Sequence, residues 1–156
     1  MKEQFSRENK RWRACREESA FLDLLHTCDL LSRGPAQVLK QEDLSATQYN
    51  ALRILRGTPE GLPCGEIASR MITRDPDVTR LLDRLEKRRL IERFREAKDR
   101  RMVMGRITAE GLRILARLDQ PVEQVHRKQL GHLGKNRLWA LTQLLDIARA
   151  QVQITP

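Results

Sequence analysis

The sequence has few of the residues that build disulfide frameworks, metal sites or membrane spans. Its 156 residues include three cysteines, Cys15, Cys28 and Cys64. An odd number of widely spaced cysteines supports neither a disulfide framework nor a C-x-x-C metal site. No apolar run approaches the ~18 residues of a membrane span, and the start of the chain, charged from Lys2 onward, has no signal-peptide core. These absences favour a cytoplasmic protein without a membrane partner.

The sequence also lacks the residue patterns of common catalytic and metal sites. It contains no phosphate-binding loop, no paired carboxylates in an apolar setting and no Ser/His/Asp order typical of a hydrolase. His126 and His132 have no matched acidic cluster, and His26 is remote from both in the sequence, so surface or core histidines are a simpler interpretation than zinc ligands. We therefore expect no catalytic residue, no metal and no cofactor, and we expect that the protein is not an enzyme.

What the chain has in excess is positive charge. Its 30 Lys and Arg outnumber 21 Asp and Glu, giving a net charge of +9 and a pI of about 10.2. Such an excess indicates a polyanionic partner, most simply nucleic acid. An acidic membrane surface is the competing partner, but the cations form no single polybasic run beside an apolar anchor. From Arg74 to Arg106, 12 Lys or Arg stand against 7 Asp or Glu, so over half of the excess lies in about a fifth of the chain.

The segment from Thr73 to Arg89 has the periodicity of an amphipathic helix. Its apolar residues recur at i, i+3, i+4 and i+7, which predicts one buried face. Asp75 is expected to cap this helix, with Pro76 at the first helical position. A basic outer face on such a helix fits the major groove of B-DNA, although a merely solvated face is the alternative for this pattern taken alone. The outer face carries Asp77, Arg80, Arg84, Lys87 and Arg88.

Residues 90–107 follow as LIERFR, EAKD and RRMVMGRI, a pattern that predicts a β-hairpin. A basic tip on this hairpin, next to a groove-reading helix, can enter an adjacent minor groove. Asp99 stands two residues before Arg101, close enough to accept its guanidinium and hold it extended. The hairpin carries five cations in nine positions: Arg93, Arg95, Lys98, Arg100 and Arg101.

The rest of the chain is predicted to be helical, so the fold class is mostly α with a small β-wing. A long first helix is expected to be interrupted or kinked at Gly34-Pro35. The second helix starts with a capping box at Ser45 to Gln48. A short strand at Leu62-Pro63 and a helix from Cys64 precede the basic helix. The helix from Cys64 and the basic helix form a helix-turn-helix, and the hairpin adds the wing. Thr108 caps the fifth helix, and a sixth follows a turn near 131–134.

The first, fifth and sixth helices have apolar faces that a small winged lobe cannot cover. We expect them to cover one another across a two-fold axis, forming a homodimer whose recognition helices lie ~34 Å apart and match a palindromic site. The expected division is an arm and dimerisation helix at 1–43, a winged helix-turn-helix lobe at 44–108 and dimerisation helices at 109–156.

Three segments carry a family resemblance: DRRMVMGRITAEG (Asp99 to Gly111), ITRDPDVTRLLDRLEKRRLIER (Ile72 to Arg93) and LSATQYNALRILRG (Leu44 to Gly57). They are similar to the wing, the recognition helix and the preceding helix of the MarR family of bacterial winged helix-turn-helix transcriptional regulators. The resemblance implies a triangular homodimer that represses nearby genes until a small molecule or an oxidant weakens DNA binding. Arg89, where the family commonly has Gly, and Gly105, where a larger apolar residue is usual, depart from the pattern.

The expected partners are double-stranded DNA and a second copy of the chain. No polar constellation identifies a ligand, but by analogy a small aromatic effector fits the family. The DNA-binding candidates are Arg74, Asp75, Asp77, Thr79, Arg80, Arg84, Arg88, Lys98, Asp99, Arg100 and Arg101.

The cysteines leave a redox alternative open. Cys15 is the candidate redox residue, because Arg13 and Arg16 on either side favour its thiolate. Cys28 lies on the apolar stripe of the first helix and is expected to be a small core residue. A thiol-based regulator of the same fold is therefore one alternative function, and a winged-helix protein-interaction module without specific DNA readout is another.

Overall fold

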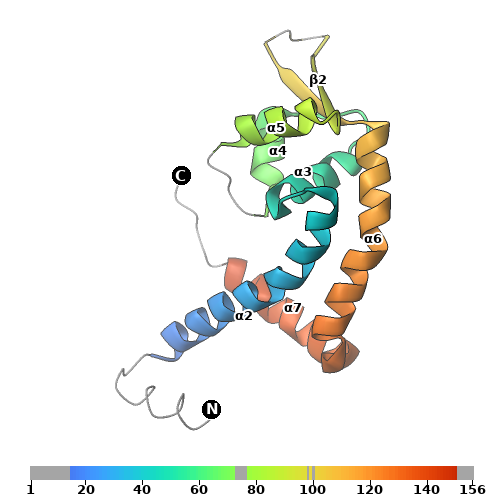
Figure 1. The fold of residues 1–156 in the computed structure, drawn as a ribbon. Coiled ribbons are helices and arrows are strands. Elements are labelled where there is room, and N and C mark those ends of the chain that lie inside the picture. Colours follow the sequence, from blue (N-terminus) through green and yellow to red (C-terminus); the bar gives the residue numbers. More distant parts are fainter. Residues whose placement is uncertain (1–14, 73–76, 98, 100, 151–156) are drawn as a thin grey trace. The chain divides into compact units, whose positions relative to one another are not determined.

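The computed structural model describes residues 15–72, 77–97, 99 and 101–150, and Figure 1 shows its ribbon. The chain forms two compact units, one ending at Gly34 and the other beginning at Pro35. The elements are α2 (Arg16–Leu39), η1 (Lys40–Glu42), α3 (Ala46–Arg56), β1 (Leu62–Pro63), α4 (Cys64–Arg70), α5 (Val78–Lys87), β2 (Ile91–Arg95), β3 (Val103–Ile107), α6 (Ala109–Leu130), η2 (Gly131–Leu133) and α7 (Gly134–Ala150).

This order confirms the predicted fold class, a mostly helical chain with a small antiparallel sheet. Of the interruption or kink expected at Gly34-Pro35, the interruption is wrong, because Pro35 lies inside α2, and the kink stays a prediction. Proline removes one N–H···O bond from a helix, and the turns on both sides continue past that loss. No helix in the described part of the chain combines the length and the apolar character needed to cross a membrane.

The sheet has the strand order β1-β3-β2, and both pairs are antiparallel. Gly105 in the middle strand pairs with Leu62 on one side and Arg93 on the other. A Cβ at Gly105 would lie 3.1 Å from Cδ1 of Ile67, a fully buried side chain of α4. The departure from the family pattern at Gly105 therefore lets α4 pack closely against the sheet.

The core of the second unit lies between the sheet and α3 to α6. The inward face of α5 is confirmed, since Leu81, Leu82 and Leu85 are buried and Val78 packs partly against them. This burial fixes which face of α5 remains outside. The largest fully buried side chains are Leu39, Leu52, Leu55, Ile67, Leu82, Leu85, Leu90, Ile91, Leu115 and Leu118.

Two of the predicted helix caps in this unit, those of α3 and α6, are confirmed. Ser45 and Gln48 form the reciprocal capping box at the start of α3. Thr108 accepts a hydrogen bond from the N–H of Gly111 at the start of α6, and its hydroxyl donates to the carbonyl of Arg89 at 2.7 Å. A Cβ at Gly111 would lie 2.4 Å from the carbonyl oxygen of Leu90. Glycine at position 111 thus lets α6 begin directly against the chain that leaves α5.

Arg89 adopts the left-handed backbone that the family pattern assigns to glycine, with φ 58°. Two hydrogen bonds accompany it: the N–H of Arg89 donates to the carbonyl of Glu86 at 2.8 Å, and that of Leu90 donates to the carbonyl of Leu85 at 3.0 Å. This is the Schellman arrangement that ends many helices. These bonds offset the steric cost of a side chain at this position, so the turn from α5 into β2 is preserved.

Candidate nucleic-acid interface

Helix α5 begins at Val78, and its N-cap is Asp77. The Asp77 carboxylate accepts the N–H of Arg80 at 3.0 Å and pairs with the Arg80 Nε at 2.9 Å. The prediction that Asp75 caps this helix is therefore wrong, because a cap carboxylate must reach an N–H two or three residues further on, and Asp77 does so. The candidates Arg74 and Asp75 lie outside the described residues.

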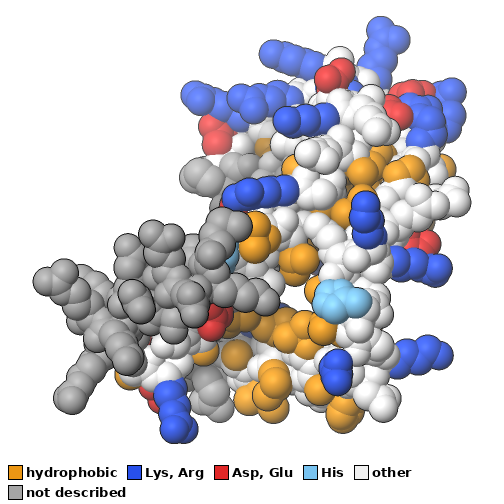
Figure 2. All heavy atoms as spheres, turned by 60° about the horizontal axis from the view of Figure 1, so that its bottom comes forward, with side chains coloured by type: hydrophobic (Ala, Val, Ile, Leu, Met, Phe, Trp, Pro, Cys, Tyr) orange, Lys and Arg blue, Asp and Glu red, His pale blue; other side chains and the backbone are white. Residues whose placement is uncertain are grey.

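The outer face of α5 is cationic and open to solvent. Figure 2 shows Lys and Arg side chains gathered at the end of the molecule where Figure 1 places α5 and the hairpin. The Arg80 side chain is 78% exposed despite its ion pair. Arg84 is exposed and has no ion pair among the described residues. The exposed residues of this face are Thr79, Arg80, Arg84, Lys87 and Arg88.

Arg88 differs from the other candidates because its guanidinium already has partners. It donates to the carbonyl of Asp43 at 2.6 Å and to the carbonyl of Glu42 at 2.8 Å. Those carbonyls end the 3-10 turn before α3, so Arg88 ties the end of α5 to that turn. The Glu42 side chain in turn accepts two hydrogen bonds from Arg117 of α6, and these bonds hold the pKa of the Glu42 carboxyl below its ordinary value.

The hairpin of β2 and β3, which we call the wing, confirms the strand prediction. Within its tip the Asp99 carboxylate accepts the backbone N–H of Arg101 at 2.9 Å. The structure thus differs from the expected bond to the Arg101 guanidinium, since a carboxylate two residues earlier in a tight turn reaches the backbone N–H. Asp99 shapes the turn, and the Arg101 side chain is exposed. Lys98 and Arg100 lie outside the described residues.

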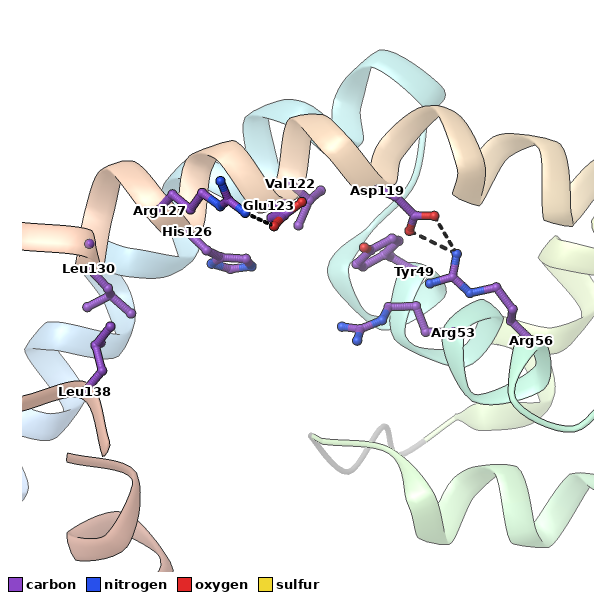
Figure 3. Close-up of a pocket in the computed structure, with 11 residues that line it drawn as sticks. Tyr49, Arg53, Arg56, Asp119, Val122, Glu123, His126, Arg127, Leu130 and Leu138 are labelled. Atoms are coloured by element: carbon purple, nitrogen blue, oxygen red, sulfur yellow. Dashed lines mark hydrogen bonds and ion pairs between the residues drawn. The ribbon is translucent and has the colours of Figure 1, made fainter. Parts of the chain in front are cut away.

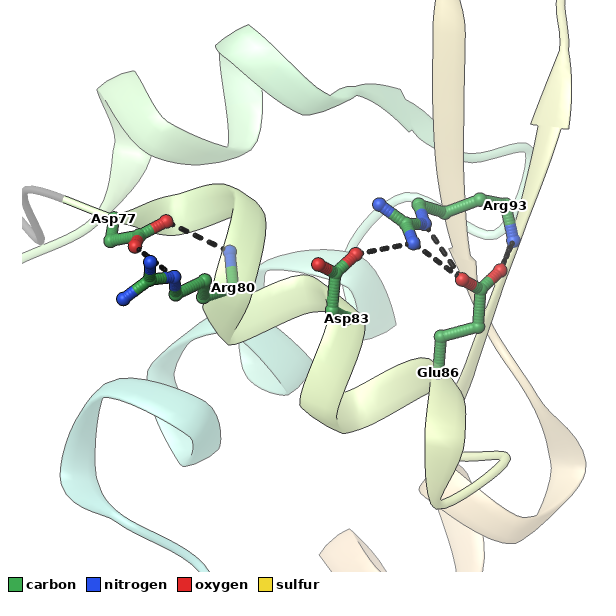
Figure 4. A network of polar contacts seen from close by, with 5 residues as sticks. All are labelled: Asp77, Arg80, Asp83, Glu86 and Arg93. Atoms are coloured by element: carbon green, nitrogen blue, oxygen red, sulfur yellow. Dashed lines mark hydrogen bonds and ion pairs between the residues drawn. The ribbon is translucent and has the colours of Figure 1, made fainter.

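Arg93 is a wing cation that does not lie at the tip. Figure 4 shows its guanidinium directed from β2 toward two carboxylates of α5, those of Asp83 and Glu86. The sequence pattern placed Arg93 among the five cations of the hairpin, and its contact with α5 was not predicted. Acidic residues three positions apart on α5, followed at once by a strand, were the available signal.

A small polar groove lies between the first turn of α3 and α5. Its volume is about 210 Å³, and it places Ser45, Thr47 and Gln48 beside Arg80 and Arg84. Hydroxyl groups and the N–H groups of a helix start commonly contact DNA phosphates. The sequence prediction omitted these residues, although the capping box located them.

A larger cavity of about 460 Å³ lies between α3 and α6 and is also lined by Leu138 of α7 (Figure 3). Tyr49, Val122 and Leu130 supply apolar lining, and the Arg53 guanidinium lies 5.7 Å from the centre of the Tyr49 ring. Two further arginines of the lining are already paired with carboxylates: Nη1 of Arg56 donates to both oxygens of Asp119, and Arg127 contacts Glu123.

The charge of Arg53 is not neutralised in this way, since it has no ion pair among the described residues. His126 also lines the cavity, from α6. The cavity therefore combines an apolar wall with one unpaired cation, a setting that suits a small planar anion.

The cysteines occupy three different environments. Cys64 is half-buried, and burial raises the pKa of its thiol, which disfavours the reactive thiolate. Cys15 is exposed at the start of α2, where its Sγ accepts the N–H of Glu18 at 3.4 Å. Cys28, expected in the core, is exposed in the single chain. Within the described residues no group of three His, Cys, Asp or Glu side chains could hold a metal ion.

Comparisons with known proteins agree with this geometry. The family model described as MarR family matches residues 44–103. A MarR transcription factor from Planctomyces limnophilus is 38% identical, with 88% of this chain and 99% of that chain covered and a TM-score of 0.66. The homoprotocatechuate degradative operon repressor of Escherichia coli is 26% identical over 109 residues, 70% of this chain and 73% of that protein.

A third comparison shows likeness of fold. BpsR of Bordetella bronchiseptica, whose DNA binding is regulated by 6-hydroxynicotinic acid, is 19% identical with a TM-score of 0.79, covering 91% of this chain and 100% of that chain. The helix-turn-helix, the wing and the extent of these matches lead to one conclusion. The chain belongs to the MarR family of winged-helix transcriptional regulators.

Proposed function

We propose that the protein is a homodimeric repressor that binds palindromic operators and releases them when a small aromatic anion binds. The observation that carries the DNA-binding part is the exposed face of α5, where Arg80 and Arg84 lie open to solvent while the opposite face is buried. Arginine can pair with guanine edges in the major groove. Arg101 at the wing tip is placed by sequence to enter the adjacent minor groove. Arg74, Asp75, Lys98 and Arg100 remain candidates for further contacts.

Exposed apolar side chains support the homodimer. On α7, Trp139 is 68% exposed, Leu144 65% and Ile147 63%. On α2, Phe21 and Leu25 are also more than half exposed. Large apolar side chains exposed together usually mark an association surface. A second copy of the chain is the partner that would bring two copies of α5 to one palindrome.

The cavity between α3 and α6 supports regulation by a small molecule. A carboxylate placed against Arg53 would neutralise its charge, and the Tyr49 ring beside it offers a flat apolar surface. The cavity of about 460 Å³ falls in the range that binds small ligands. BpsR, which shares the fold, responds to an aromatic acid. For this chain we propose an effector of the same chemical class.

The test of DNA binding begins with selection of duplexes from a random pool, followed by anisotropy titrations of the selected duplex and a shuffled one. A specific repressor selects a palindrome and keeps a large preference for it as salt rises. A protein-interaction module would bind both duplexes equally, and its affinity for both would fall together as the salt concentration rises. Equal affinities at every salt concentration would therefore rule out the proposal.

The test of the effector uses 6-hydroxynicotinic acid and benzoate as probes on the protein–DNA complex. We expect millimolar probe to release the wild-type protein from the selected duplex, and we expect Arg53→Gln to bind DNA normally while resisting release. Arg113→Gln, on an exposed part of α6 away from the cavity, is the matched control. Release of Arg53→Gln at the wild-type probe concentration would argue against this site.

Cys15 supports a second candidate, a regulator that responds to oxidants. The thiol is exposed at the start of α2, where oxidants can reach it, and it accepts the backbone N–H of Glu18. Treating the protein with peroxide should then weaken DNA binding, reversibly with dithiothreitol, in the wild type and not in Cys15→Ser. Equal loss in both proteins would exclude this cysteine as the sensor.

A further inference from the structure

Arg93 makes an unusually complete set of contacts with α5. Its backbone N–H donates to Glu86 Oε1 at 3.1 Å. Its guanidinium donates to Glu86 Oε2 from Nε at 2.9 Å and from Nη2 at 2.6 Å, and to Asp83 Oδ1 from Nη2 at 2.5 Å. One residue of β2 is thereby joined to two successive turns of α5 (Figure 4).

Partial burial distinguishes these contacts from ordinary surface ion pairs. The Arg93 side chain is 25% exposed, against 78% for Arg80 on the outer face. Charge-assisted hydrogen bonds of this kind are stronger than neutral ones, and partial burial reduces their screening by solvent. The hydrogen bond from Arg93 also holds the pKa of the Glu86 carboxyl below its ordinary value, so the carboxylate is charged at neutral pH.

Apolar packing at the same junction is incomplete. A cavity of about 410 Å³ separates α4, α5 and the wing, with Arg93 in its wall beside Thr79, Ala68 and Val103. A Cβ added at Gly65, which also lines it, would meet nothing within 4 Å. Leu85 of α5 and Ile91 of β2 are packed in the core at one end of this junction, and the cavity interrupts that packing beside Arg93. The ion pairs of Arg93 bridge the two elements beside this cavity.

We propose that Arg93 is a positioning residue for DNA binding, which with Glu86 and Asp83 sets the angle between α5 and the wing. This inference rests on the proposed DNA binding. The guanidinium is committed to α5, so its charge is not used on a phosphate. A wing held at a fixed angle loses less conformational freedom when α5 and the wing tip engage neighbouring grooves together.

The decisive variant is Glu86→Gln, because two explanations predict opposite signs. If only long-range charge matters, removing a carboxylate from a DNA-facing lobe strengthens binding to a polyanion. If Glu86 positions the wing through Arg93, its removal weakens binding, on the order of 3- to 10-fold, and Arg93→Gln weakens it similarly. The double variant should then be little worse than either single one, as expected for residues that act as a unit.

Glu92→Gln is the matched control. Glu92 also lies on β2 and pairs with an arginine, Arg106 at 2.7 Å, but that pair stays within the sheet and does not reach α5. Glu92→Gln removes the same charge from the same lobe without touching the contacts of Arg93 with Glu86 and Asp83. We expect Glu92→Gln to bind DNA as tightly as the wild type or more tightly.

Amide hydrogen exchange supplies a readout that does not involve DNA. In Glu86→Gln the wing amides, including the Glu96 N–H that donates to Met102 at 3.0 Å, should exchange faster while the buried amides of α3 keep their protection. If exchange of the wing amides is unchanged, or if Glu86→Gln binds the selected duplex as well as the wild type, the positioning role of Arg93 is overturned. The proposed DNA binding would stand in that case. A wild-type protein that selects no duplex overturns the proposed DNA binding and this inference with it.

Discussion

At the scale of single residues, short-range geometry decides where the recognition helix begins and ends. Asp77 supplies the first N–H acceptor of α5, and Arg89 supplies the left-handed turn that closes it. At Asp77 the cap is a single carboxylate that accepts the N–H of Arg80, so a conservative change can test it.

Asp77→Ala should lower the free energy of unfolding by about 1 kcal/mol, the usual effect of removing a helix cap. Asp77→Asn is the control, because the amide oxygen still accepts the N–H of Arg80. Urea denaturation followed by circular dichroism measures both. Equal destabilisation by the two substitutions would show that the charge of Asp77, and not its role as an acceptor, stabilises the helix.

Arg84→Ala and Arg101→Ala should affect DNA binding differently. If Arg84 pairs with a guanine edge, its removal lowers discrimination between the selected palindrome and a variant with that base pair changed, by ~1–3 kcal/mol. Arg101→Ala should weaken binding to every duplex and reduce the salt dependence. Anisotropy titrations at several salt concentrations separate the two patterns. Wild-type affinity for Arg101→Ala at all of them would remove the wing tip from the interface.

Residue roles were the part that the sequence predicted least completely. The exposed and buried faces of α5 follow from helical periodicity and are confirmed by burial. The partners of Arg88 and Arg93 do not follow from it, because they depend on carbonyls and carboxylates that tertiary packing brings near. Arg88 donates to a turn 45 positions away in the chain, a relation that no local pattern contains.

At the scale of elements, ion pairs join helices and strands, some of which are distant in sequence. Arg117 of α6 pairs with Glu42 before α3, Arg56 of α3 pairs with Asp119 of α6, and Arg93 joins β2 to α5. Patterning predicted the elements themselves, including the capping box, the strand at Leu62-Pro63 and the hairpin. It could not predict the pairs of Arg56 and Arg117, whose partners lie 63 and 75 positions away, nor the cavity between α3 and α6, which exists only once the helices pack.

The acid sensitivity of the fold should depend on Glu86. Its folded-state pKa is lowered, chiefly by the hydrogen bond from Arg93, relative to an ordinary value of 4.5. A carboxyl with a lowered folded pKa contributes stability that is fully present above its unfolded pKa and is lost as pH falls through the folded value. The stability difference between wild type and Glu86→Gln should therefore be constant above about pH 5.5 and shrink as pH falls below about 4.5.

Urea denaturation midpoints at a series of pH values measure this difference. Glu92→Gln serves as the comparison, and a dependence on pH identical to that of Glu86→Gln would mean that general charge repulsion, and not the contact with Arg93, sets the acid response. Glu42, whose pKa is lowered by Arg117, should add a second contribution of the same sign.

At the scale of the whole molecule, one chain presents two unlike surfaces that make sense together only if the chain associates. The second unit carries a cationic face on α5 and, on α7, large apolar side chains that are exposed in the described chain. In the proposed complex a single α5 would contact only a few base pairs, whereas two copies related by a two-fold axis would read a palindrome and add their binding free energies. The sequence predicted the apolar faces of the flanking helices, but the exposure of Trp139 and Ile147 is a property of the folded chain.

Ile147→Asp should therefore convert a dimer to a monomer and weaken DNA binding through loss of the second half-site. Gln143→Asp adds the same charge to the same helix without removing an apolar side chain, and we expect it to remain dimeric. Sedimentation velocity measures the mass, and anisotropy titrations measure how binding depends on salt. The slope of log affinity against log salt concentration should fall by about half if half of the phosphate contacts are lost. If Ile147→Asp is still dimeric and binds the palindrome normally, the association surface does not lie on α7. If the wild type is monomeric and still prefers the palindrome, two-fold recognition itself is refuted.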